Sequence, residues 1–128
     1  MKSYLVDTNV FLRFFLKDNI PLFIEASQLF EKASKGKVQL FASNIVFFEI
    51  SFVFKSVYKL SREEIIENLE PILSSPYIQW SEQQNLQTAL AIYATHPSLS
   101  LVDCYLHVKA KTMEAELFTF DENLKKLQ

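Results

Sequence analysis

The chain has 128 residues, of which 49% are hydrophobic and 22% charged, a balance that argues against disorder and predicts one folded domain over residues 1–128. Its single cysteine excludes an internal disulfide framework and any multi-cysteine zinc or iron–sulfur site, which is simplest to reconcile with a cytoplasmic protein. The formal charge of −2 gives by itself no reason to expect nucleic acid as a partner, and no apolar run is long enough to cross a membrane.

Short β-prone runs alternate with helical segments along the chain. Pro21 and Gly36 suit the start and the end of a helix, and Ser61 with Glu64 forms a capping-box pattern. In chain order we predict strand 4–6, helices 8–16 and 21–33, strand 38–42, a helix to 58 capped by Ser43, helix 61–75, strand 77–80, helices 82–95 and 101–113, strand 117–120 and a short helix from 122. This order favours a three-layer α/β/α sandwich with a short, mainly parallel sheet. Ligands bind such sheets beyond the carboxyl ends of the strands.

Four acids stand out against this frame. Asp7 follows the first predicted strand and Asp121 follows the last, while Glu49 and Asp103 lie within later helices. If the predicted fold is right, all four can point to one end of the domain. Each also has a purely structural interpretation: Asp7 and Asp121 can cap helices, and Asp103 fits the third position after a Ser100 cap.

Glu49 is harder to explain by a structural role alone. Eight of the ten residues from Ile45 to Phe54 are apolar, so we expect little of this helix to face solvent. A buried carboxylate is costly unless it is paired or bound to a metal.

Four carboxylates in one pocket repel one another unless a cation neutralises them. Oxygen ligands without a cysteine or histidine cluster suit Mg²⁺ or Mn²⁺ better than zinc. Such ions activate water for phosphodiester hydrolysis without a side-chain nucleophile. His107, four residues after Asp103, is a single histidine that we interpret as a surface or packing residue, and Cys104 we interpret as packing.

At these positions the chain resembles the PIN-domain family of metal-dependent ribonucleases, and within it the VapC-type toxins of toxin–antitoxin pairs. Asp7-Thr8-Asn9 looks like the family's opening motif, and Thr119-Phe120-Asp121 resembles its Thr-x-Asp ending. Glu49 and Asp103 match the family's helix-borne acids. One departure is Cys104, where the family usually has alanine.

The resemblance implies that Asp7, Glu49, Asp103 and Asp121 are the catalytic residues and bind one or two Mg²⁺ or Mn²⁺ ions, with Asn9 and Thr119 as supporting polar groups. It implies endonucleolytic hydrolysis of RNA by metal-activated water. The implied partners are a second copy of the chain, forming a homodimer, and a small antitoxin protein.

Two alternatives remain open from the residues. A catalytically silent PIN-like fold can serve as a protein-interaction module, although such a module gains nothing from an uncompensated acid cluster. A phosphotransferase or phosphatase with an aspartate nucleophile after the first strand is a poorer fit. Those enzymes generally need a second aspartate two residues on, where this chain has Asn9.

Overall fold

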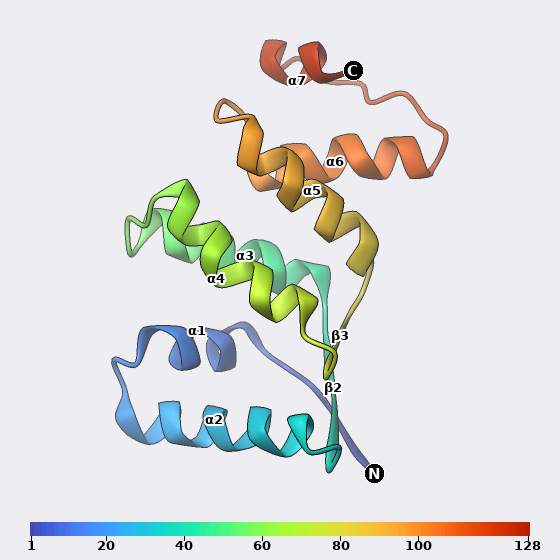
Figure 1. Ribbon diagram of the computed structural model, residues 1–128. Helices are drawn as coiled ribbons and strands as arrows, with labels where there is room; N and C mark the ends of the chain where they lie inside the picture. Colours follow the sequence, from blue (N-terminus) through green and yellow to red (C-terminus); the bar gives the residue numbers. More distant parts are fainter.

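The computed structural model describes all 128 residues and contains three strands and seven helices (Figure 1). The elements are β1 (Lys2–Leu5), α1 (Thr8–Leu16), α2 (Ile20–Ser34), β2 (Val38–Ala42), α3 (Asn44–Ser56), α4 (Arg62–Ser74), β3 (Ile78–Trp80), α5 (Gln83–Thr95), α6 (Leu101–Thr112) and α7 (Glu122–Leu127). No helix combines the length and the apolar character needed to cross a membrane.

The three strands form one parallel sheet in the order β1-β2-β3. Tyr4 lies opposite Leu40, and Leu40 lies opposite Ile78. Helices connect each strand to the next, as parallel pairing requires. The expected α/β/α fold with a short parallel sheet is confirmed, and the carboxyl ends of all three strands meet at one edge.

The core lies where the sheet meets α1, α3 and α4. Phe11, Phe47 and Phe54 are fully buried. The ring of Trp80 on β3 stacks on Phe11 and meets Phe47 edge-on, each with centroids 5.4 Å apart, and its indole N–H donates to the carbonyl of Ile72. Much of the phenylalanine excess is therefore core packing, because aromatic pairs bury large areas in specific geometries.

Local caps explain where several helices begin. Asn19 accepts a hydrogen bond from the Leu22 N–H at the start of α2, and Ser43 caps α3. Ser61 and Glu64 form the predicted capping box of α4. Gly36 has a positive φ of 72° just after α2, a conformation that glycine adopts at little cost.

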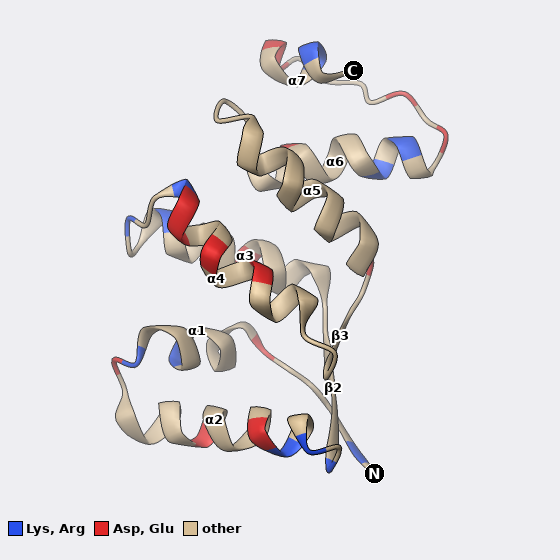
Figure 2. Ribbon diagram, in the orientation of Figure 1, with Lys and Arg blue, Asp and Glu red and all other residues tan.

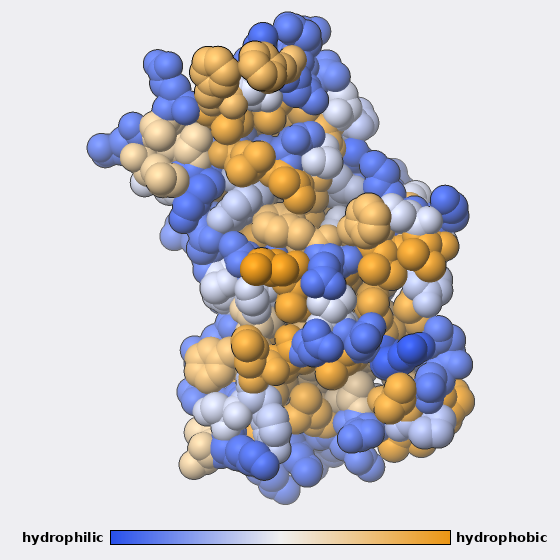
Figure 3. All heavy atoms as spheres, turned by 180° about the vertical axis from the view of Figure 1, so that it is seen from behind, coloured by the Kyte–Doolittle hydropathy of each residue, from blue (hydrophilic) through white to orange (hydrophobic).

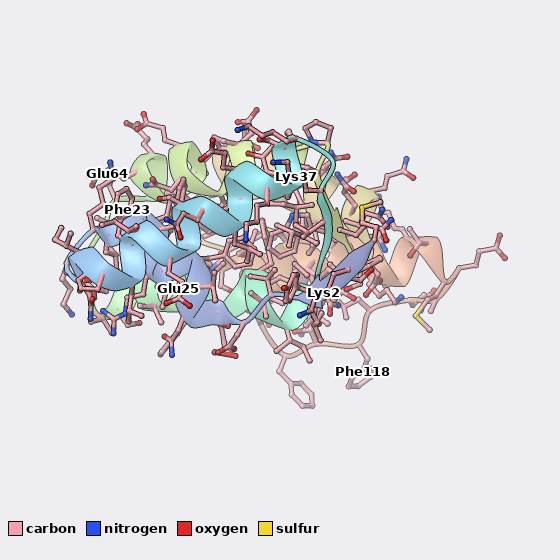
Figure 4. The ribbon with its side chains drawn as sticks, turned by 90° about the horizontal axis from the view of Figure 1, so that it is seen from below. Lys2, Phe23, Glu25, Lys37, Glu64 and Phe118 are labelled. Carbon is pink, nitrogen blue, oxygen red and sulfur yellow. The ribbon has the colours of Figure 1, made fainter.

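The strand predicted at 117–120 is wrong. This segment links α6 to α7 and forms no strand, and no backbone group of residues 116–120 takes part in a backbone–backbone hydrogen bond. Phe118 and Phe120 are 87% and 85% exposed, and Figure 4 shows Phe118 pointing away from the ribbon. The residues favour a strand, but a strand forms only against a partner. The outer edge of β1 is unpaired, while this segment lies beside α6 and α7 at the other end of the molecule (Figure 1).

Candidate functional site

Asp7 lies at the carboxyl edge of the sheet, two residues beyond β1, as predicted. It is the N-cap of α1, and its Oδ1 accepts a hydrogen bond of 2.9 Å from the Thr8 N–H. The side chain is exposed and its second oxygen has no partner within the chain. A carboxylate here is stabilised by the positive end of the helix dipole and still keeps one oxygen free.

Asp103 closes a capping box at the start of α6. Its Oδ2 accepts from the Ser100 N–H, and the Ser100 hydroxyl accepts from the Asp103 N–H, both at 3.1 Å. The structural interpretation of this residue as a capping group is therefore confirmed. It leaves Oδ1 of a half-buried carboxylate without a hydrogen-bond partner in the chain.

The neighbours of Asp103 on α6 are packing residues, as predicted. Cys104 is fully buried, and burial raises the pKa of its thiol to about 11, which keeps it protonated and unreactive near neutral pH. His107 is only 4% exposed, its Nδ1 has no hydrogen-bond partner, and burial lowers its pKa.

Arg62 at the start of α4 holds the loop that leads into α6. Its guanidinium donates to the carbonyls of Tyr93, Pro97 and Leu99 at 2.8, 2.9 and 3.0 Å. It also lies 3.8 Å from the centroid of the Tyr93 ring, within cation–π range. Because Leu99 directly precedes the Ser100 cap, this contact fixes the turn that presents Asp103.

Asp121 is the N-cap of α7, with Oδ1 accepting from the Leu124 N–H at 3.0 Å. Thr119 supports it from the preceding loop, because the Thr119 hydroxyl accepts a hydrogen bond from the Asp121 N–H at 3.1 Å. Leu124 is buried and anchors α7 to the rest of the chain. As with Asp7 and Asp103, the capping role uses one carboxylate oxygen.

Glu49 is exposed, so the prediction that it is buried is wrong. It makes no hydrogen bond and no ion pair. Ile45 and Phe52, one turn to either side on the same face of α3, are 66% and 67% exposed. The error arose because α3 turns an apolar stripe towards solvent as well as towards the core. Viewed from behind, the molecule has large apolar areas around its middle (Figure 3).

The four acids lie at the start of α1, on α3, on α6 and at the start of α7. These helices follow one another along the long axis of the molecule rather than gathering at one end (Figure 1). No three acidic, histidine or cysteine side chains are grouped so that they could hold a metal ion together. None of the four acids is paired with a lysine or arginine. The ion pairs of the chain are Arg13–Asp18, Lys35–Glu31, Lys109–Glu82 and Lys125–Glu122.

Asn9, the last residue of the opening motif, lines a groove of about 610 Å³ between α1 and α2. Apolar side chains of both helices line part of this groove, and Arg13, Glu25 and Lys32 add charges to it. Figure 4 shows Glu25 on α2, and Figure 2 shows the basic residues gathered at the end of α2, near the amino ends of β1 and β2. These basic residues therefore lie away from the carboxyl edge of the sheet, where Asp7 lies.

A polar cluster that the sequence analysis missed lies at the same carboxyl edge. The carboxylate of Glu82, between β3 and α5, accepts hydrogen bonds from side chains of α3, α5 and α6. The predicted helix 82–95 begins at Glu82, with no further role expected for this residue. The one available signal was its place two residues after a strand, close to the sheet edge at which ligands bind in α/β folds.

Comparison with known proteins agrees with this fold. The PIN domain family model matches residues 4–128. The chain is also 31% identical over 124 residues to a VapC ribonuclease of Aquifex aeolicus (strain VF5), a match that covers 96% of this chain and 90% of that protein. PIN-domain nucleases generally use divalent metal ions. The chain therefore belongs to the PIN-domain family.

Proposed function

We propose that the chain, as one PIN domain over residues 1–128, is a metal-dependent endoribonuclease and the toxin of a toxin–antitoxin pair. The observation that carries the proposal is that the four acids, which match the family's acidic residues, are neither ion-paired nor fully hydrogen-bonded. No lysine or arginine neutralises any of them, and each of them keeps at least one unengaged carboxylate oxygen. The similarity to a VapC ribonuclease supports the same activity.

The donor set fits a hard divalent cation. Asp7, Glu49, Asp103 and Asp121 would hold one or two Mg²⁺ or Mn²⁺ ions, because carboxylate oxygens without thiol or imidazole partners are the ligands these ions prefer. When bound, the ion would supply an activated water and neutralise charge on the scissile phosphate. Asn9 and Thr119 are proposed as supporting polar groups, and Thr119 already holds the backbone of Asp121.

The positions of the acids add a requirement to the proposal. No three of them share a site in the structure, so binding of one ion by all four requires Asp7 and Asp121 to come closer to Glu49 and Asp103. We expect Mn²⁺ to reduce the radius of gyration measured by X-ray scattering. An Asp103→Asn variant in the same buffer is the control and should show no such change.

The proposed partners follow from the similarity to VapC. They are an RNA substrate, a small antitoxin protein and a second copy of the chain, in the cytoplasm. Exposed apolar side chains on α3 and in the 117–120 segment support protein partners, because contiguous exposed apolar surface commonly marks interaction sites.

An RNA cleavage assay on the purified chain tests the activity. It compares Mg²⁺, Mn²⁺ and EDTA for the wild type, for Asp103→Asn and for Glu31→Gln, a control that removes an exposed acid paired with Lys35. We expect metal-dependent cutting by the wild type and by Glu31→Gln, and its loss in Asp103→Asn. Equal cutting by all three proteins would identify a contaminating nuclease and contradict the proposal.

The second candidate function is a catalytically silent interaction module. The observation that favours it is the dispersal of the four acids, because no three of them share a site. If the wild type cuts none of several structured RNAs and Mn²⁺ does not raise its melting temperature, the module is the better account.

A further inference from the structure

The side chain of Glu82 is a hub between three parts of the fold. Its Oε1 accepts from the Lys109 ammonium at 2.7 Å and from the Asn85 amide at 3.3 Å. Its Oε2 accepts from the Asn44 amide at 2.8 Å and from the Tyr105 hydroxyl. One carboxylate therefore receives four donors from α3, α5 and α6.

The backbone at Glu82 is held in an unfavourable conformation. Its φ and ψ are 55° and 38°, in the left-handed region, where a residue other than glycine costs about 1 kcal/mol or more. The side chain is directed into the cluster and makes no capping hydrogen bond to α5. Such backbone strain persists only where the surrounding contacts hold it in place, which indicates that these contacts fix the position of Glu82.

The donors of this hub belong to the helices that carry two of the proposed metal ligands. Asn44 is the first residue of α3, five positions before Glu49, and its backbone N–H also donates to the Ser81 hydroxyl at 2.8 Å. Tyr105 is on α6, two positions after Asp103, and its ring meets Phe48 of α3 edge-on at 5.0 Å. Glu82 thus ties the start of α3 to the middle of α6.

We propose that Glu82 is a positioning residue for the nuclease reaction: through Asn44, Tyr105 and Lys109 it fixes α6 against α3, and so fixes Asp103 relative to Glu49. The inference rests on the proposed function for its catalytic consequence. Glu82 itself binds neither metal nor substrate in this account. Its charge is already matched by Lys109, unlike that of the four family acids.

The electrostatics of the Glu82 cluster favour the ion pair between Glu82 and Lys109. The hydrogen bond from Lys109, followed by that from Tyr105, lowers the pKa of the Glu82 carboxyl, and the same contact with Glu82 raises the pKa of Lys109. Both shifts favour the charged forms of the two side chains.

The test combines a distance measurement with kinetics. Spin labels at Ile45→Cys on α3 and Lys111→Cys on α6 report how the two helices are placed, because both positions are exposed and the buried Cys104 thiol should not react. The variants are Glu82→Gln, which keeps the shape of the side chain, and Glu82→Leu, which removes every acceptor. Glu31→Gln is the matched control for loss of one ion-paired acid.

We expect the α3–α6 distance distribution to broaden in Glu82→Leu and, less strongly, in Glu82→Gln. We also expect kcat for RNA cleavage to fall by about 10–100-fold in Glu82→Leu with KM unchanged, the usual cost of losing a supporting group behind metal ligands. Glu31→Gln should match the wild type in both measurements.

The outcomes separate the two proposals. A variant at residue 82 that is folded and keeps the wild-type distance distribution and kcat overturns the positioning role. If Glu82→Leu fails to fold, Glu82→Gln decides the matter by the same criteria. If the distances change as expected but the wild type cuts no RNA, the nuclease proposal fails while the structural part of the inference stands.

Discussion

Two regions of the molecule differ in how their carboxylates are neutralised. At the junction of β3, α3 and α6, Glu82 is surrounded by donors and paired with Lys109. At the starts of α1, α6 and α7, single acids cap helices and have no basic partner, and on α3 Glu49 is solvated and unpaired. A carboxylate that is already neutralised holds the fold together. One that is not remains available to a cation, and this difference separates the proposed ligands from the proposed scaffold.

The largest expected effect comes from changing an unpaired acid. Asp7→Asn should lower metal-dependent RNA cleavage by at least about 100-fold, because losing a metal ligand costs at least as much as losing its supporting partner. The free energy of unfolding should change by no more than a few tenths of a kcal/mol, about the difference between aspartate and asparagine as N-caps. Kinetics and urea unfolding measure the two effects. Asp18→Asn, at an acid paired with Arg13, is the control, and equal cutting by wild type and Asp7→Asn would remove Asp7 from the site.

The second effect is structural and concerns the loop before α6. Arg62→Met should lower the free energy of unfolding by about 2 kcal/mol, because it leaves one carbonyl of α5 and two of the following loop without their charged donor. Arg13→Met, which removes an arginine with a single carboxylate partner near the surface, should cost less. Unfolding in urea checks both variants. Equal losses of unfolding free energy in the two variants would show that the Arg62 hydrogen bonds stabilise the fold no more than the Arg13–Asp18 ion pair does.

A smaller effect concerns pH and the buried His107. Burial lowers its pKa in the folded chain, so the unfolded chain binds more protons as pH falls below the ordinary histidine pKa of about 6.5. Stability should therefore decrease as pH falls from about 7 until the folded-state pKa is passed. Melting curves of the wild type and of His107→Phe over this range test the sign. If both proteins lose stability in parallel, other groups cause the effect.

The smallest effect is expected at the exposed aromatic residues before α7. Phe118→Ser should change the free energy of unfolding by less than about 0.5 kcal/mol, because the ring is 87% exposed and buries little area in the chain. Phe47→Ala, at a fully buried ring, is the contrasting variant and should cost about 3–5 kcal/mol. A large loss in Phe118→Ser at low protein concentration would mean that the ring is packed within the chain in solution.

Features set by neighbouring residues could be predicted from the sequence. The bounds of α1 and β2, the capping box of Ser61 and Glu64, and the capping roles of Asp7 and Asp121 all depend on local hydrogen bonds and periodicity. The short parallel sheet followed from the alternation of strands and helices, although one of the four predicted strands, 117–120, does not form. The PIN family followed from short motifs in the right order.

Features that depend on distant residues could not be predicted. The segment at 117–120 has the composition of a strand, but pairing requires an edge beside it, which composition does not report. Glu49 was expected inside because its helix is apolar, yet which stripe of α3 faces solvent depends on how α1, α4 and α6 cover it. The donors of Glu82 come from positions up to 38 residues away, and no spacing rule connects them.

Metal binding by the free chain tests the central claim most directly. Mn²⁺ is titrated into the wild type, Asp7→Asn and Glu31→Gln without RNA, and the free ion is followed by electron paramagnetic resonance. The account predicts saturable binding by the wild type and by Glu31→Gln, and its loss in Asp7→Asn. Binding of Mn²⁺ by Asp7→Asn with wild-type affinity would contradict it.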